Sequence, residues 1–232
     1  MIYTIADDPG TLAAALADRL VLEARAAWAG GHILRIALSG GQTPARLYEE
    51  LRRLGNAVPW PALEIFFSDE RAVPPDHPDS NYGLAHRLWL GSAPPGAVIH
   101  RIHGEEGADA AARQYRDLLD RATRGGLALD IVLLGLGTDG HIASLFPGMP
   151  LTPAESVAAV PAQDGRCARI TLTLPTLVGA RRRIVLAPGA AKAPALRASL
   201  APGAATPLGQ LMAQAAVEFW LDRAAGCALC PA

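Results

Sequence analysis

The sequence predicts an α/β protein with a mostly parallel, Rossmann-like sheet and helices on both of its faces. Short apolar runs of strand length alternate with Ala-rich runs of helical spacing, half of the 232 residues are hydrophobic, and no internal repeat is present. This alternation is typical of strand–helix–strand units, in which each crossover helix covers one face of a parallel sheet. We expect residues 1–232 to form a single domain, with room for a smaller lobe within about 148–180.

The predicted elements follow this rhythm along the chain. A first helix covers 11–31, because Leu12, Leu16 and Leu20 recur at helical spacing and the glycine pair at 30–31 suits a helix C-terminus. Further helices are predicted at 107–123 and 192–201, and strands at 32–38, 63–69, 129–137, 167–174 and 181–189. We expect the Pro-rich stretch 147–165 to be an ordered loop that leads from one lobe to the other.

Charge and composition argue against several classes of partner. The chain has 21 basic and 22 acidic residues, so its net charge of -1 gives no bulk attraction to nucleic acid or to an anionic membrane. The sequence begins without a basic region followed by an apolar one, and no apolar run is long enough to span a bilayer. We therefore expect a cytoplasmic protein with no nucleic-acid or membrane partner, and we favour a monomer.

The three cysteines, Cys167, Cys227 and Cys230, are too few and too irregular for a disulfide framework. Cys227 and Cys230 have the CxxC spacing of zinc and redox sites, but the sequence offers no second pair and no nearby histidine. We expect reduced thiols and interpret the CxxC spacing as incidental.

A first polar cluster follows the predicted strand 32–38, in "IALSGGQTPARLYEELRRLG". Gly40 and Gly41 allow the backbone to approach a ligand closely, Thr43 is predicted to cap the next helix with Pro44 at its first position, and Gly55 is predicted to end it. With Ser39, these groups make an anion site at a helix N-terminus, although an ordinary tight turn is the simpler alternative. The spacing matches neither common nucleotide-binding glycine motif, so a phosphate on a small molecule fits better.

A second cluster, Asp69, Glu70 and Arg71, ends the predicted strand 63–69 and opens a long Pro-rich loop. At the carboxyl end of a parallel strand these side chains are expected to face the ligand crevice. A solvated charge run is the alternative, and it would be preferred if the triplet stood alone.

The third cluster, "GLGTDGHIASLFPG", follows the apolar run "LALDIVLLG" and contains Asp139 and His141. A lone histidine is more often structural than catalytic. A neighbouring carboxylate in a Gly-rich loop changes that balance, because the carboxylate can fix the imidazole tautomer and raise its basicity. His141 is therefore the candidate general base.

Taken together, "LSGGQTP", "SDERAVPPDHPDSN" and "GLGTDGHIASLFPG" resemble the 6-phosphogluconolactonase family in their order and spacing. The agreement extends to "IHGEEGADAAARQY", "RITLTLP", the lysine of "PGAAK" and "VEFWLD", and so covers essentially the whole chain. The resemblance implies a glucosamine-6-phosphate isomerase-like fold. It also implies hydrolysis of 6-phospho-D-glucono-1,5-lactone to 6-phosphogluconate without metal or cofactor.

On this resemblance, His141, Asp139 and Arg71 are the expected catalytic residues. The expected substrate- and phosphate-binding residues are Ser39, Gly40, Gly41, Thr43, Asp69, Glu70, Arg169 and Lys192. Which arginine serves the phosphate and which serves the reacting carbonyl stays open. The family more often has glycine after the strand, whereas this chain places Pro188 ahead of Gly189, so the position of Lys192 is less firmly expected.

Two alternative functions stay open at this stage. Sugar-phosphate isomerases and deaminases resemble the chain in the phosphate loop and in "DGHIA", but they typically have Tyr after the acidic pair and "FNEP" after the histidine loop. Here Arg71 and "SLFPG" occupy those places and favour the lactonase. A non-catalytic sugar-phosphate sensor would usually carry a DNA-binding module, and the sequence shows no basic or helix-turn-helix segment for one.

Overall fold

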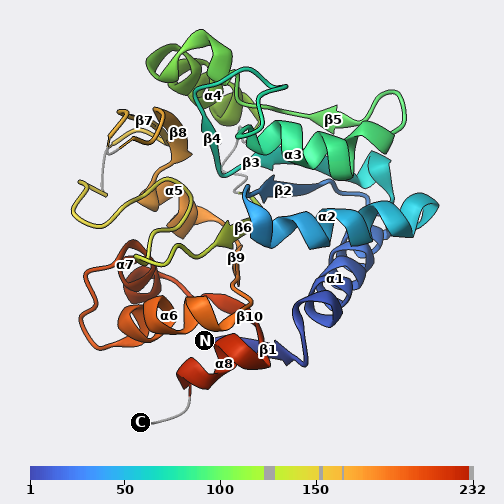
Figure 1. The fold of residues 1–232 in the computed structure, drawn as a ribbon. Helices are drawn as coiled ribbons and strands as arrows, with labels where there is room; N and C mark the ends of the chain where they lie inside the picture. The colour runs from blue at the N-terminus through green and yellow to red at the C-terminus, as the bar shows by residue number, and fades with distance from the viewer. Residues whose placement is uncertain (123–128, 152–153, 164, 230–232) are drawn as a thin grey trace.

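The computed structural model describes residues 1–122, 129–151, 154–163 and 165–229. At its centre lies a seven-stranded sheet with the strand order β1-β10-β9-β6-β2-β3-β5, and every neighbouring pair is parallel (Figure 1). The expected α/β class is confirmed. The strands are β1 (Ile2–Ala6), β2 (Leu34–Leu38), β3 (Leu63–Phe67), β5 (Val98–Ile99), β6 (Ile131–Gly135), β9 (Arg182–Leu186) and β10 (Glu218–Asp222).

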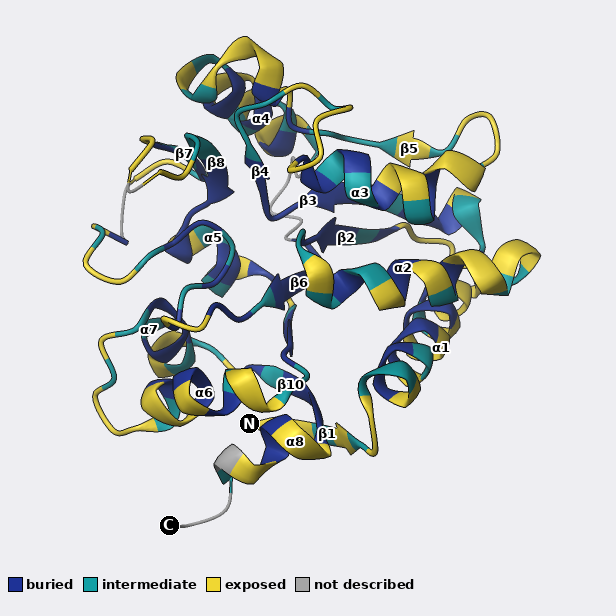
Figure 2. Ribbon diagram, viewed as in Figure 1, coloured by how far each residue is buried: buried dark blue, intermediate teal, exposed yellow. Residues whose placement is uncertain are grey.

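Helices cover both faces of this sheet, as expected. Figure 1 shows α1 (Pro9–Ala29), α2 (Gln42–Leu54) and α3 (Asn81–Leu88) on one side, and α5 (Leu174–Gly179), α6 (Ala193–Leu200) and α7 (Pro207–Gln214) on the other. Helix α4 (Ala108–Ala122) packs beside a second, smaller sheet, and α8 (Arg223–Gly226) follows β10. Buried residues lie on the inward sides of the helices (Figure 2).

Helix α1 illustrates how local sequence sets these elements. Asp8 caps its start by accepting hydrogen bonds from the backbone N–H groups of Gly10 and Thr11, at 2.7 and 3.0 Å. The predicted face carrying Leu12, Leu16 and Leu20 is buried, and the helix ends at Ala29 with Gly30 as its C-cap. None of the described helices combines the length and the apolar composition that crossing a bilayer requires.

The second sheet corrects two expectations. It has three antiparallel strands in the order β4-β8-β7, namely β4 (Asp69–Arg71), β7 (Val157–Val160) and β8 (Arg169–Leu172). The strand predicted at 167–174 is therefore present as β8 but does not join the parallel sheet. The stretch 147–165 is not all loop, because β7 lies within it and gains its ladder hydrogen bonds from β8. The predicted single domain with a smaller lobe stays a prediction.

The strand order brings the polar clusters together. From β2 the chain proceeds to β3 and β5 on one side of the sheet, and from β6 it proceeds to β9 and β10 on the other. Strands β2 and β6 are neighbours, with Ile36 opposite Ile131. A parallel sheet opens a ligand crevice where its strand order reverses in this way, at the carboxyl ends of the strands. The loops after β2 and β6 face each other across this crevice.

Candidate active site

A cleft of about 380 Å³ lies at this switch point, within the size range of roughly 300–1,000 Å³ that is usual for small-molecule sites. Most of the residues singled out from the sequence line it: Ser39, Gly40, Gly41, Thr43, Asp69, Arg71, His141, Arg169 and Lys192. They come from the loops after β2, β6 and β9, from the first turn of α2 and from the strands β4 and β8 of the second sheet. The fold therefore collects side chains that are far apart in sequence into one cleft.

His141 and Asp139 form a hydrogen-bonded pair in the loop after β6. The ring Nδ1 of His141 lies 2.5 Å from Oδ1 of Asp139, and the His141 backbone N–H donates to the same oxygen at 3.2 Å. Because the ionised carboxylate can only accept, Nδ1 carries the proton and Nε2 keeps a free lone pair. Asp139 itself does not line the cleft but supports His141 from outside it.

The charge state of Asp139 suits this supporting role. Partial burial raises the pKa of the Asp139 carboxyl, but the hydrogen bonds from the backbone and the ring of His141 outweigh burial, and the pKa is lowered overall. Asp139 is therefore ionised throughout the neutral range and is available to stabilise a positive charge on the imidazole.

Gly137 makes room for the His141 ring. A Cβ atom at position 137 would lie 2.0 Å from Nδ1 of His141, which no side chain could tolerate. The Gly137 N–H also donates to the His141 carbonyl at 2.8 Å, which closes the turn. Gly137 is thus required by the packing of the imidazole, whereas a Cβ at Gly140 would meet Thr206 instead.

The loop after β2 presents backbone donors to the cleft. Helix α2 begins at Gln42 with Gly41 as its N-cap, and no side chain caps it. The predicted cap by Thr43 and the predicted place of Pro44 at the first helical position are therefore wrong. The consequence favours anion binding, because the N–H groups of the first turn are not covered by a capping side chain. The buried Tyr48 hydroxyl donates to the Ser39 carbonyl and fixes the start of this loop.

Asn81 is a cleft residue that the sequence reasoning missed. It begins α3, is 1% exposed, and donates from Nδ2 to the backbone oxygen of Asp69 at 2.8 Å and to its carboxylate at 3.1 Å. Its Oδ1 has no hydrogen-bond partner among the described residues and faces Gly40, where a Cβ atom would lie 1.6 Å away. No signal in the sequence pointed to it, because the direction of the Asn81 side chain depends on the folded loop that precedes it.

Three cations face the cleft without a carboxylate partner. Arg71 and Arg169 are direct cross-strand partners on β4 and β8, an arrangement that is unfavourable for like charges. Burial, and then the neighbouring Arg71 guanidinium, lower the pKa of Arg169. Within the described part of the chain, Nε of both arginines is buried without an acceptor, and no ion pair involves either arginine or Lys192. Lys192 lies in the cleft despite Pro188.

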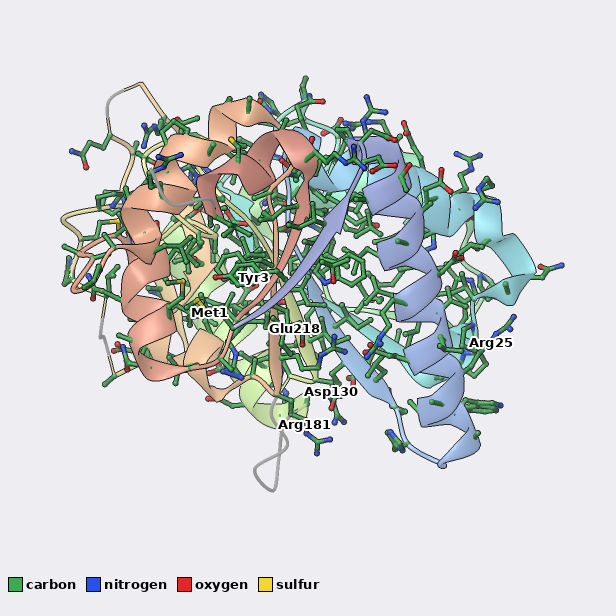
Figure 3. The ribbon with its side chains drawn as sticks, turned by 90° about the horizontal axis from the view of Figure 1, so that it is seen from below. Met1, Tyr3, Arg25, Asp130, Arg181 and Glu218 are labelled. Carbon is green, nitrogen blue, oxygen red and sulfur yellow. The ribbon has the colours of Figure 1, made fainter. Side chains whose placement is uncertain are left out.

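Arginines at the amino ends of the strands, on the side of the sheet opposite the cleft, are paired with carboxylates. Figure 3, which views the molecule from below relative to Figure 1, labels Asp130, Arg181 and Glu218 at this end of the sheet. There Arg182 pairs with Glu218 at 2.5 Å and also with Glu23, and Arg181 lies 3.3 Å from Asp130. The positive charges at the amino ends of the strands are thus neutralised within the fold. Those at the carboxyl ends are left for an anionic ligand.

Glu70 corrects a further expectation, because it does not line the cleft. Its carboxylate accepts from the backbone N–H groups of Arg71, Asn81 and Tyr82, at 2.8, 2.7 and 2.8 Å, and from the Ser80 hydroxyl at 3.1 Å. Burial raises the pKa of the Glu70 carboxyl, and these backbone donors oppose the shift. Glu70 therefore organises the turn that carries Asn81 and does not meet a ligand directly.

The cysteines considered in the sequence analysis do not line this cleft where the structure describes them. Cys167 is half-buried and Cys227 is exposed, both as free thiols, while Cys230 lies outside the described residues. Among the residues that the structure describes, no group of three or more His, Cys, Asp and Glu side chains is arranged to hold a metal ion.

Comparison with known proteins gives a consistent set of relatives. The family model described as glucosamine-6-phosphate isomerases/6-phosphogluconolactonase matches residues 7–220. The 6-phosphogluconolactonase of Synechocystis sp. is 39% identical over 201 residues, which cover 82% of each chain. That of Haemophilus influenzae is 33% identical over 203 residues, covering 84% of this chain and 87% of the relative.

Solved structures agree with this result. The 6-phosphogluconolactonase of Trypanosoma brucei superimposes with a TM-score of 0.82 at 29% identity, covering 99% of this chain and 98% of that one. A monomeric glucosamine-6-phosphate deaminase superimposes with a TM-score of 0.80 at 22% identity, covering 98% and 100% of the two chains. The latter likeness concerns the fold alone.

Proposed function

Because this chain belongs to the family of glucosamine-6-phosphate isomerases and 6-phosphogluconolactonases, we propose that it hydrolyses 6-phospho-D-glucono-1,5-lactone to 6-phospho-D-gluconate. This is a step of the oxidative pentose phosphate pathway. The observation that carries the proposal is the hydrogen-bonded pair of His141 and Asp139 in a cleft whose three cations form no ion pair with any described residue. An imidazole base beside an anion-binding surface suits hydrolysis of a phosphorylated ester.

The reaction begins with water at the lactone carbonyl. Nε2 of His141 takes a proton from the water as its oxygen bonds to the carbonyl carbon, and Asp139 stabilises the imidazolium that forms. The tetrahedral intermediate then collapses and breaks the bond between this carbon and the ring oxygen. The imidazolium returns its proton to the departing oxygen, and the new carboxylic acid ionises to give the open-chain product.

The positive groups divide between two tasks. The phosphate requires charge-assisted donors, for which the first turn of α2, Lys192 and either Arg71 or Arg169 are available in the cleft. The oxyanion of the intermediate requires a donor near the reacting carbonyl, and Arg71 or a backbone N–H is available for it. Asp69, which accepts only, is the candidate partner for substrate hydroxyl groups.

The function is tested with two substrates. Purified protein is mixed with freshly made phosphogluconolactone, and acid release is titrated above the spontaneous rate. The same protein is then mixed with glucosamine 6-phosphate, and ammonia is measured. Acid release without ammonia supports the lactonase. Ammonia would assign a deaminase instead, and binding of either compound without turnover would assign a sensor.

Metal-independence is a separate prediction. A hydrolytic metal usually takes about three protein ligands and keeps an open position for water, whereas the mechanism above uses the imidazole itself as base. Initial rates are therefore expected to survive exhaustive EDTA treatment, with a magnesium-supplemented sample as the control. Loss of activity that zinc or manganese restores would overturn the mechanism. The cytoplasmic location and the monomeric state stay predictions.

A further inference from the structure

Ser144 is a buried residue that joins two parts of the candidate active site. It lies three residues after His141, is completely buried, and does not line the cleft. Its hydroxyl donates to the Asp69 carboxylate, with Oγ 2.6 Å from Oδ2. Its backbone N–H donates to the Thr171 hydroxyl at 3.2 Å. One residue of the histidine loop is thereby bonded to both β4 and β8 of the second sheet.

The backbone beside Ser144 is strained. Ala143 has a φ of 49°, and within the described residues no other non-glycine residue has a positive φ. The turn closes with the Leu145 N–H donating to the Ile142 carbonyl at 3.0 Å, and a positive φ at its first central position usually calls for glycine. A strained backbone persists where surrounding contacts fix it. Here the two hydrogen bonds of Ser144 are those contacts.

Asp69 gains its orientation from the same bond. Asp69 is 5% exposed, and its carboxylate accepts from Ser144 on one oxygen and from Asn81, at 3.1 Å, on the other. A hydroxyl bond to an ionised carboxylate is among the stronger hydrogen bonds in proteins. It therefore sets the direction in which the remaining lone pairs of Asp69 face the cleft.

We propose that Ser144 is a positioning residue, which holds His141 and Asp69 in fixed relation by tying the strained histidine loop to the carboxylate. The proposal rests on the function proposed above and deepens it. Without the hydroxyl, Asp69 loses one of its two side-chain donors, and the loop keeps only the backbone bond of residue 144 to Thr171 against relaxation at Ala143. Ser144 contacts Asp69, the candidate partner for substrate hydroxyl groups, but none of the groups assigned to the phosphate, so KM is expected to change less than kcat.

The test compares two buried serines with the same chemical change. Ser144→Ala is set against Ser199→Ala; Ser199 is 1% exposed and accepts a hydrogen bond from Thr206 at 2.9 Å, and neither residue lines the cleft. Both variants are expected to lower the Tm. Ser144→Ala is expected to reduce kcat about 10- to 100-fold, as for a small misplacement of reacting groups, with KM changed less than about threefold. Ser199→Ala should keep kcat within about twofold.

Two further measurements distinguish positioning from a general loss of structure. In an Asp69→Ala background the Ser144 hydroxyl has nothing to orient, so Ser144→Ala should then cost less than about twofold in kcat; full multiplication of the two effects would overturn the proposal. If Ser144→Ala does not fold, Ser144→Cys is measured in its place. Because a thiol is a weaker donor than a hydroxyl, its kcat should fall below that of the wild type; a kcat equal to that of the wild type would overturn the proposal.

A spectroscopic measurement keeps the proposal testable if the proposed function fails. An inactive wild type would reject lactone hydrolysis. The His141 imidazole signal in a proton–nitrogen spectrum, assigned with His141→Asn, should still change in Ser144→Ala and stay unchanged in Ser199→Ala. Equal spectra and equal kcat values for the two serine variants would show that Ser144 is only part of the core.

Discussion

At the scale of single residues, the chemistry depends on how a short loop turns two side chains toward each other. Asp139 and His141 are separated by Gly140, whose φ of 86° is accessible to glycine at little cost. This turn lets one carboxylate oxygen meet both the backbone N–H and the ring of His141. The orientation of the proposed base is therefore built into three consecutive residues.

Replacement of His141 by Asn is expected to reduce kcat about 10²- to 10⁴-fold, the usual cost of removing a positioned base. The rates are measured by acid titration and corrected for spontaneous hydrolysis, and the Tm reports on folding. His77→Asn is the matched control, because the His77 side chain is 43% exposed and lies outside the cleft. A His141 variant with the kcat of the wild type would show that another group is the base.

Replacement of Asp139 by Asn tests the electrostatic part of the pair. Because the pKa of Asp139 is lowered, its carboxylate is charged throughout the neutral range and can stabilise the imidazolium that forms when His141 takes a proton from water. Removal of the charge should lower kcat, measured by acid titration, while the ring keeps a hydrogen-bond acceptor. A kcat equal to that of the wild type would contradict an electrostatic role for Asp139.

At the scale of elements, strand β4 decides which acidic residue meets the ligand. Successive side chains of a strand point to opposite sides. Asp69 and Arg71 accordingly face the cleft, while Glu70 points to the turn at residues 80–82. The sequence triplet suggested that all three residues belong to the site, because it read as the start of a loop and not as a strand.

Glu70→Ala is expected to lower the free energy of unfolding by at least about 2 kcal/mol, because three backbone N–H groups lose a buried acceptor. Urea unfolding measures the loss. Glu50→Ala provides the comparison, since Glu50 pairs with the exposed Arg53 on α2 and such a surface pair is worth about 0–1 kcal/mol. An equal decrease in the free energy of unfolding for the two variants would contradict the structural role assigned to Glu70.

The elements also show where sequence reasoning reaches its limit. Strands β2, β3, β6 and β9 were predictable because their apolar runs are buried in the parallel sheet. Strand β7 is the short run VAAV, and β4 is the charged triplet DER, so neither has a strong pattern of its own. Both are strands because β8 supplies their partners. That pairing places Arg71 opposite Arg169, and the sequence alone could not reveal it.

At the scale of the whole molecule, the cleft lies between two sheets that the chain connects at several points. Lys192 reaches it from the seven-stranded sheet after β9, whereas Arg71 reaches it from β4 of the smaller sheet. An anion held by both would therefore bridge the sheets. It would also relieve the opposition of Arg71 and Arg169, so the ligand should stabilise the entire fold and not only the loops it contacts.

The product 6-phosphogluconate is expected to raise the Tm, and the free energy of unfolding should increase by about 2.7 kcal/mol at 100 times its Kd.

Lys192→Ala and Arg71→Ala should each weaken the binding of 6-phosphogluconate by roughly 1.5–3 kcal/mol, the worth of a charge-assisted contact. Unphosphorylated gluconate should be affected far less. Calorimetry and thermal unfolding measure both ligands, and Arg181→Ala, whose side chain is 63% exposed at the opposite edge, should leave both unchanged. If a variant loses equal affinity for the two ligands, its cation does not bind the phosphate. An anion that bridges the sheets contacts both Lys192 and Arg71. If only one of the two variants loses its preference for 6-phosphogluconate over gluconate, the phosphate contacts only the sheet that carries that residue.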